Sequence, residues 1–237
     1  MCTVTYLPTS SGFIFTSNRD EIPLRAASTL PPAAYNTDTG TLYFPKDAQG
    51  GTWFGVAANG RIHCLLNGAF KKHAHKPPYR KSRGLVVLES LGFRDAEAFA
   101  GSYDLSGIEP FTMVMVEPDE QKSLFEFRWD GLKVHLTEKD VAQPNIWSSA
   151  TLYDETATRK REDVFKKWMA GLREPDNESV MQLHFSGSYG DPKNDFRMNR
   201  DGIVQTVSIT QITSAEGNQT LFYRDLLSGM AHSLAVK

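Results

Sequence analysis

Alternating apolar and polar residues near the start of the chain predict a β-hairpin. Val4 and Tyr6 alternate with threonines, residues 8–12 are turn formers, and a second apolar run leads to the charged group at 18–21. Two extended runs joined by such a turn are typical of antiparallel strands. The hairpin would bring the charged group back beside residue 2.

The same alternation recurs along much of the chain. Asn59-Gly60 lies between two apolar runs, which is the strongest local signal for a hairpin. Strands are predicted at 41–44, 52–57, 61–66, 111–117, 123–129, 132–136, 203–212 and 219–224. The three strands between 111 and 136 are separated by short turns and predict a β-meander.

Apolar residues at helical spacing predict a smaller set of helices. These lie at 84–91, 94–100, 154–171 and 179–185, and the tail from Asp225 is predicted to be helical as well. Ser82 is expected to cap the first of them. Because no linker or repeat divides the chain, we predict one domain over 1–237. Its class is α+β, with two antiparallel sheets in contact and helices outside.

Composition excludes several classes of protein. The chain has 237 residues and a formal net charge of −2, so no overall field attracts nucleic acid or an anionic membrane. No apolar run approaches the length of a membrane span, and no signal peptide is apparent, which predicts a cytoplasmic protein without a transmembrane segment. The two cysteines, Cys2 and Cys64, make no disulfide framework, and a bridge between them is disfavoured in a reducing compartment. A homo-oligomer is compatible with this composition.

A cysteine at position 2 is the first candidate for chemistry. Once Met1 is removed, Cys2 carries both a thiol and a free α-amine. A thiol has a pKa of ~8.5 and an α-amine one of ~7.7–8.0, so the amine can accept the proton that the thiol loses. Arg19 could favour the thiolate, and Asp20 could orient the amine. The alternative is that Cys2 is a small buried apolar side chain, as Cys64 is predicted to be.

Several motifs together resemble one protein family. They are Cys2-Thr3, TSNRDE at 16–21, YFPKD at 43–47, GGTWFGV at 50–56, the segment 59–68 that ends in LLNG, and WSSATLYD at 147–154. This combination resembles the NRDE family, also called the transport and Golgi organisation protein 2 family. The match is dense through residue 68 and recurs near residue 150, whereas the C-terminal part matches poorly.

The resemblance implies a relationship to the N-terminal-nucleophile (Ntn) hydrolases of the choloylglycine hydrolase and penicillin acylase kind, and hence a four-layer αββα sandwich. In those enzymes the N-terminal cysteine attacks an amide, an arginine and an aspartate near the first hairpin assist, and an asparagine donates to the oxyanion. These roles carry over to Cys2, Arg19, Asp20 and Asn67. Loss of one oxyanion donor typically lowers the rate by ~10²–10³.

Two positions depart from the pattern of those hydrolases. A second asparagine is replaced by Ser148, whose hydroxyl could still donate, and a late arginine is replaced by Gln205, which cannot supply a positive charge. The resemblance implies an amidohydrolase that cleaves a C–N bond of a small molecule without a cofactor. The alternative is a non-catalytic protein on the same scaffold that binds or carries haem or an acyl lipid, with Cys2 as a haem ligand or as a structural residue.

Histidines and basic residues raise two further interpretations. His63, His73 and His75 could form a metal site, but the last two lie in a basic, proline-flanked stretch without an adjacent carboxylate, so a solvated loop and no metal are predicted. The basic residues between 71 and 83 could hold a phosphate or carboxylate of a ligand at the start of the following helix. The alternative for them is a solvated surface.

Overall fold

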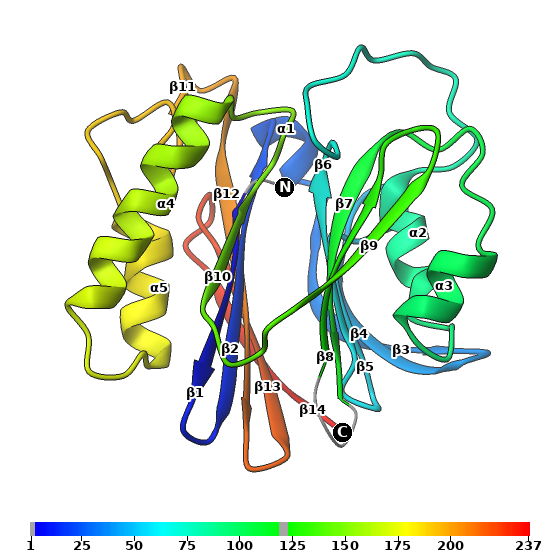
Figure 1. Cartoon of the computed structure of the whole chain (residues 1–237), viewed down its shortest axis with the longest axis horizontal. Coiled ribbons are helices and arrows are strands. Elements are labelled where there is room, and N and C mark those ends of the chain that lie inside the picture. The colour runs from blue at the N-terminus through cyan, green and yellow to red at the C-terminus, as the bar shows by residue number, and fades with distance from the viewer. Residues whose placement is uncertain (1–2, 119–122) are drawn as a thin grey trace. The chain divides into compact units, whose positions relative to one another are not determined.

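A computed structural model describes residues 3–118 and 123–237. Within them the chain forms antiparallel sheets with few helices, which confirms the predicted α+β class (Figure 1). The described residues form two compact units. The first comprises the described part of Met1–Ser28 with Ala142–Ser148 and Tyr153–Ala235, and the second comprises the described part of Thr29–Val141 with Ser149–Leu152 and Val236–Lys237. The single domain over 1–237 stays a prediction.

The first unit is built on an antiparallel sheet whose strand order differs from the order along the chain. Its elements are β1 (Thr3–Thr9), β2 (Gly12–Glu21), α1 (Pro23–Ala26), β10 (Asn145–Ser148), α4 (Glu155–Ala170), α5 (Asn177–Ser186), β11 (Asn199–Arg200), β12 (Val204–Ala215), β13 (Asn218–Asp225) and β14 (Ala231–Val236). The strand order is β10-β1-β2-β12-β13-β14, and β11 pairs with β12. The predicted hairpin is confirmed as β1 and β2, and β2 lies at the centre of the sheet beside β12, a strand far away in sequence.

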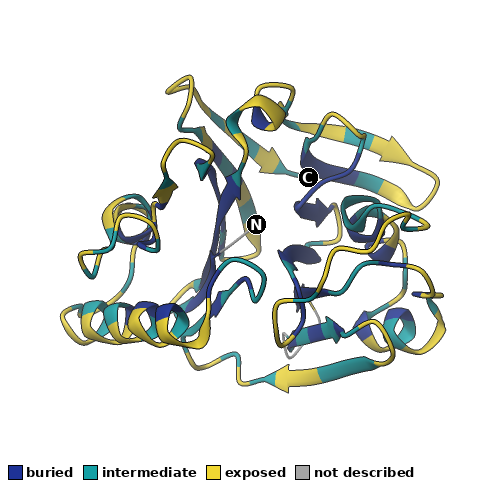
Figure 2. Ribbon diagram, turned by 90° about the horizontal axis from the view of Figure 1, so that it is seen from above, coloured by how far each residue is buried: buried dark blue, intermediate teal, exposed yellow. Residues whose placement is uncertain are grey.

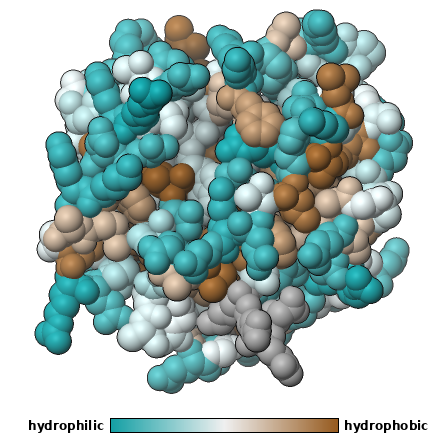
Figure 3. All heavy atoms as spheres, viewed as in Figure 1, coloured by the Kyte–Doolittle hydropathy of each residue, from teal (hydrophilic) through white to brown (hydrophobic). Residues whose placement is uncertain are grey.

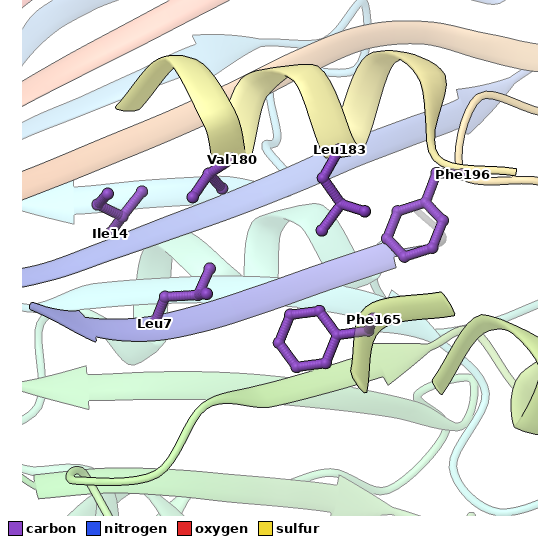
Figure 4. Close-up of a cluster of buried hydrophobic side chains, with 6 residues drawn as sticks. All are labelled: Leu7, Ile14, Phe165, Val180, Leu183 and Phe196. Carbon is purple, nitrogen blue, oxygen red and sulfur yellow. The ribbon is translucent and has the colours of Figure 1, made fainter. Parts of the chain in front are cut away.

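Helices α4 and α5 cover one face of this sheet. Leu7 on β1 and Ile14 on β2 are paired in the strand register and therefore point to the same face. They pack against three helical side chains and one from the following loop, which are Phe165, Val180, Leu183 and Phe196 (Figure 4). This buried cluster fixes the helices over β1 and β2, and it defines the helix-covered face of the sheet.

Most helices predicted in this unit are confirmed, but the helix predicted for the C-terminal tail is not. The Asp154 side chain caps α4 by accepting from the Ala157 amide at 2.8 Å. The prediction of a helix after Asp225 is wrong, because Ala231–Val236 forms β14 at the edge of the sheet. Exposed and half-buried residues alternate strictly along β14, which is the period of a strand with one covered face.

The second unit is built on a sheet that follows the chain. Its elements are β3 (Leu30–Thr37), β4 (Gly40–Lys46), β5 (Phe54–Ala57), β6 (Ile62–Asn67), α2 (Arg83–Ser90), α3 (Ala96–Ser102), β7 (Phe111–Glu117), β8 (Ser123–Trp129) and β9 (Val134–Lys139). Each strand pairs with the next one in sequence, which confirms both the hairpin at Asn59-Gly60 and the meander. Ser82 caps α2, and Cys64 is fully buried on β6, as predicted.

Burial follows the expected pattern in both units. In each unit the central strands, such as β2 and β7, are largely buried, whereas the edge strands β3, β9 and β14 are mainly half-buried or exposed (Figure 2). The helices alternate between buried and exposed residues along their length. Figure 3 shows apolar side chains scattered among hydrophilic ones on the face in view. Within the described residues, no helix has the length and apolar character that a membrane crossing requires.

Candidate active site

Asp20 is held near the end of β2 by two hydroxyl groups. Tyr153 Oη donates to Asp20 Oδ2 at 2.7 Å, and Thr206 Oγ1 donates to Oδ1 at 2.6 Å. Only 4% of Asp20 is exposed, and a buried carboxylate needs donors to replace the water that it loses. Because each carboxylate oxygen accepts a hydrogen bond, the orientation of Asp20 is fixed before a ligand binds.

A β-bulge supplies one of these two donors. In the pairing of β12 with β2, Ser208 lies opposite Arg19 and Thr206 lies opposite Asp20, with the register shift between them. Without the extra residue, Val207 would lie opposite Asp20, and valine has no donor. The Met198 amide donates to Thr206 Oγ1 at 2.9 Å, so the hydroxyl proton is left for Asp20. The bulge therefore re-aims a side chain at the carboxylate.

A second buried network ties β1 and β2 to helix α5. His184 Nδ1 lies 2.8 Å from Asn18 Oδ1, and His184 Nε2 lies 2.8 Å from Thr5 Oγ1. The Asn18 amide also donates to the carbonyls of His184 at 3.0 Å and Phe196 at 2.7 Å. Since Asn18 Oδ1 can only accept, Nδ1 carries the histidine proton and Nε2 accepts from Thr5. Burial, followed by the positive charge of Arg161, lowers the pKa of His184 to about 3.

Arg19 and Asp20 lie on opposite faces of β2. Successive side chains of a strand alternate, and Asp20 is on the helix-covered side with Asn18. Arg19 is buried to 3% exposure, and its Nη2 lies 3.9 Å from Glu21 Oε2, which is also 3.5 Å from Arg25 Nη1. The structure thus places the two predicted residues at the same end of β2, with their side chains on opposite faces of the sheet.

The sequence analysis missed three residues of this region, Arg161, Tyr153 and Thr206. Arg161 on α4 is fully buried and donates to Thr3 Oγ1, and its guanidinium carbon lies 4.0 Å from the centroid of the Tyr153 ring. The signal for Arg161 was present, because it lies four residues from both Ala157 and Phe165, in the middle of the buried stripe of α4. Neither the bulge nor the Tyr153 contact has a comparable signal in the sequence.

Ser148 lies on β10, on the other side of β1. It pairs with Thr3, which in turn pairs with Asn18, so the three residues form one row across β10, β1 and β2. Residues directly opposite each other in an antiparallel pair point to the same face. Ser148 is therefore on the face of Thr3 and Asn18. Gln205, where the related hydrolases imply an arginine, is half-buried and pairs with Glu21.

In the second unit, the backbone at the end of β6 positions Asn67. The Asn67 carbonyl accepts from Ser149 Oγ at 2.9 Å, and the Gly68 amide donates to the Pro110 carbonyl at 3.1 Å. Thr112 Oγ1 donates to the Gly68 carbonyl at 2.9 Å. Within the described residues, the half-buried side-chain amide of Asn67 makes no hydrogen bond. Its backbone is thus fixed while its amide remains available to a ligand.

Gly68 is required at this point for two reasons. Its φ is +80°, a conformation that L side chains rarely adopt. A Cβ atom here would lie 2.8 Å from Thr151 Cγ2, closer than real contacts allow. The backbone therefore passes close to the segment of Thr151 at this point.

The predicted site residues are divided between the two units, with one exception. Cys2 lies outside the described residues. Arg19, Asp20 and Ser148 belong to the first unit, and Asn67 belongs to the second. Their catalytic roles stay predictions.

The histidine-rich loop is bound to a carboxylate that the sequence did not indicate. Glu109 Oε1 lies 3.0 Å from His73 Nε2 and 3.3 Å from His75 Nδ1, and Glu109 Oε2 lies 2.9 Å from Arg83. The premise that these histidines have no nearby carboxylate was therefore wrong. Across 3–118 and 123–237, no three His, Cys, Asp or Glu side chains are grouped so as to hold a metal ion.

Comparison with known proteins identifies the family of this chain. The model described as Transport and Golgi organisation 2 matches residues 1–194. The chain belongs to this family. No curated protein matches the chain.

Solved structures show the fold of this Transport and Golgi organisation 2 family member. The Caenorhabditis elegans N-acylethanolamine-hydrolyzing acid amidase ortholog is similar at a TM-score of 0.61 and 14% identity, over 91% of this chain and 93% of that one. A variant of the conjugated bile acid hydrolase from Clostridium perfringens is similar at 0.56 and 9%, over 99% and 92%. These neighbours are Ntn hydrolases, and the chain has an Ntn-hydrolase-like fold.

Proposed function

We propose that this protein is an N-terminal-nucleophile cysteine amidohydrolase that cleaves a C–N amide bond of a small molecule after Met1 is removed. The observation that carries the proposal is the buried, pre-oriented carboxylate of Asp20 beside the N-terminal strand. Two hydroxyls fix this carboxylate, and a β-bulge exists at the position that supplies one of them. A buried carboxylate contributes less to the stability of the fold than apolar side chains in the same place would. Its presence is therefore better explained by an interaction with a charged partner.

The position of Asp20 supports a role next to the α-amine of Cys2. Thr3 pairs with Asn18. Cys2 directly precedes Thr3 in the chain, and Arg19 and Asp20 directly follow Asn18. A carboxylate in this place accepts a hydrogen bond from the amine and orients its lone pair, and the guanidinium of Arg19 favours the thiolate.

The reaction then needs no cofactor. The Cys2 thiol gives its proton to the α-amine, and the sulfur attacks the substrate carbonyl carbon. The ammonium returns the proton to the leaving nitrogen as the C–N bond breaks, which leaves a thioester on Cys2. A water molecule, deprotonated by the same amine, attacks the thioester carbon, and the thiol is restored as the carboxylic acid product leaves.

Asn67 is the proposed donor to the oxyanion. Its backbone is held by three hydrogen bonds around Gly68, and its amide makes none within the part of the chain that the structure describes. A donor whose position is fixed beforehand is the kind that stabilises a developing negative charge most. Ser148, on the row of Thr3 and Asn18, is proposed as a second donor.

The substrate class follows from chemistry and from the neighbours. The two hydrolases above are named for the compounds that they hydrolyse, an N-acylethanolamine and a conjugated bile acid. We propose an N-acyl amide of a small amine for this chain too, and a cytoplasmic location for the reaction.

The test is turnover of an N-acyl amide panel, measured as release of the free amine. Wild type should release amine, and Cys2→Ala should not. Cys64→Ala is the matched control, because Cys64 is buried on β6 and its loss should leave turnover in place. Asn67→Ala should lower turnover by ~10²–10³-fold. Absence of turnover over the whole panel, or equal turnover in Cys2→Ala, would contradict the proposal.

One observation favours the second candidate, a carrier of haem or an acyl lipid. The position where the related hydrolases imply a cation holds the uncharged Gln205. Under this alternative, ferric haem titration would give a Soret shift that Cys2→Ala abolishes, or an acyl lipid would bind without release of amine. Either result together with no turnover would replace the amidohydrolase by the carrier.

A further inference from the structure

Arg161 is the most unusual buried group of the first unit. Its side chain is fully buried on α4, and its Nε atom has no hydrogen-bond partner among the described residues. Within the described residues, no carboxylate lies within 4.0 Å of its guanidinium nitrogens, whereas the buried Arg61 has Glu117 as its ion-pair partner at 2.5 Å. A buried cation without a paired anion is costly, so its retention calls for a reason.

The contacts of Arg161 direct its charge toward the start of the chain. It donates to Thr3 Oγ1, and it donates to the Asn194 carbonyl at 3.4 Å. The rings of Tyr153 and Phe196 flank the guanidinium carbon, with centroids at 4.0 Å and 5.2 Å. These rings and one side-chain hydroxyl stabilise a cation but do not neutralise it. The positive charge therefore acts at the residue that is covalently bonded to Cys2.

We infer that Arg161 is a positioning residue for the N-terminal nucleophile, which holds Thr3 and supplies an uncompensated positive charge beneath the first strand. This inference rests on the proposed function of Cys2. A nearby cation favours a thiolate over a thiol and a neutral amine over an ammonium. Both effects are what a cysteine needs to act as a nucleophile with its own α-amine as the base.

The charged and titratable groups around Arg161 are consistent with this role. His184 on α5 is buried and neutral, and the charge of Arg161 is a cause, after burial, of its lowered pKa. Asp20 on β2 accepts a hydrogen bond from Tyr153, whose ring lies against the guanidinium of Arg161. Further charged or titratable groups near this side of α4 are Asp154, Tyr189, Asp191, Asp195, Lys160 and Arg200.

The acids around this part of α4 already accept hydrogen bonds from other groups. Asp195 accepts from Ser188 Oγ at 2.6 Å and from the Tyr189 amide at 2.9 Å. Asp154 is engaged in capping α4, and Asp191 accepts from Asn194 Nδ2 at 2.7 Å. Each carboxylate on this side thus has donors of its own, and Arg161 keeps a net positive influence on the N-terminal strand.

The test is the pH dependence of Cys2 alkylation by iodoacetamide, followed by peptide mass mapping that separates Cys2 from the buried Cys64. Arg161→Gln keeps an amide donor for Thr3 and removes the charge, whereas Arg161→Lys keeps the charge. The thiol pKa of Cys2 should rise by about one unit in Arg161→Gln, so that alkylation at pH 7 slows roughly tenfold, and it should stay near the wild-type value in Arg161→Lys.

Arg200→Gln is the matched control. Its guanidinium carbon lies 5.6 Å from the centroid of the same Tyr153 ring, but Arg200 is half-exposed on β11 and should leave the thiol pKa unchanged. An unchanged thiol pKa in Arg161→Gln, or an equal rise in Arg200→Gln, would overturn the inference. If Arg161→Gln does not fold, Arg19→Gln decides the matter. A Cys2 pKa that stays below the ordinary ~8.5 without the charge of Arg19 would support the inference, and one at or above it would overturn the inference.

This readout does not require turnover. If Arg161→Gln shifts the thiol pKa and no amide is cleaved, the inference stands and the proposed hydrolase fails. If amides are cleaved by Cys2 and the thiol pKa does not respond to Arg161, the hydrolase stands and the inference fails.

Discussion

The buried His184 should make the first unit sensitive to acid. In the folded protein Nδ1 donates to Asn18 and Nε2 accepts from Thr5, so the neutral ring has both partners that it needs. A second proton on Nε2 would remove the acceptor of the Thr5 hydroxyl and would place a positive charge in a fully buried site near Arg161. Acidification is therefore expected to favour the unfolded chain, in which the histidine is hydrated.

The magnitude follows from the two pKa values of His184. Its folded pKa is lowered from 6.5 to about 3. Between these values the unfolded state binds more protons than the folded state. The contribution of His184 to the free energy of unfolding is therefore fully present above pH 6.5, decreases as the pH falls below 6.5, and levels off below the folded pKa. By linkage, titration of this single group should lower the free energy of unfolding by about 2 kcal/mol between pH 7.5 and pH 5, and by roughly 4–5 kcal/mol at the acid limit.

The assay is urea unfolding of wild type and His184→Gln at pH 7.5, 6 and 5. The variant loses ring contacts and should be less stable at pH 7.5, but its stability should fall by about 2 kcal/mol less than that of wild type on going to pH 5. His232→Gln, at a half-buried position on β14, is the control and should keep the wild-type slope. Parallel profiles for wild type and His184→Gln would refute the reasoning.

Three further substitutions test other parts of the account. Tyr153→Phe removes one of the two donors to the buried aspartate of β2 and should lower the urea-derived free energy of unfolding by about 1–2 kcal/mol; no loss would contradict the contact. Gly68→Ala should cost more than Gly190→Ala, since both have positive φ but only Gly68 lacks space for a Cβ, and equal melting temperatures would argue against that close approach. Arg61→Met leaves Glu117 buried without its 2.5 Å partner and should cost about 3–5 kcal/mol in the same unfolding assay, whereas a cost below about 1 kcal/mol would rule out a structural ion pair.

Local signals in the sequence were sufficient for most of the fold. The first hairpin, the hairpin at Asn59-Gly60 and the meander follow from alternation and turn residues, and the caps Ser82 and Asp154 mark where α2 and α4 begin. The pairing of β2 with β12 joins residues far apart in the chain, and no local pattern specifies it. The strand β14 was mistaken for a helix because a short edge strand carries only a weak apolar signal.

The site was predicted less completely than the fold. The resemblance to the NRDE family pointed to Asp20 and Asn67, but the donors to Asp20 depend on a bulge and on a loop residue whose positions the sequence does not reveal. Arg161 could have been found, because a charged residue in the apolar stripe of α4 is buried unless the helix is distorted. Counting only the apolar members of that stripe concealed it.

The central claim is that the working polypeptide begins with Cys2, whose thiol and free α-amine act together. The most direct test is the intact mass of the protein isolated from cells in which it is naturally produced. The account predicts a mass lower than that of the full translated chain by one methionine residue, with no acetyl group added. A mass that retains Met1 in every molecule would contradict it.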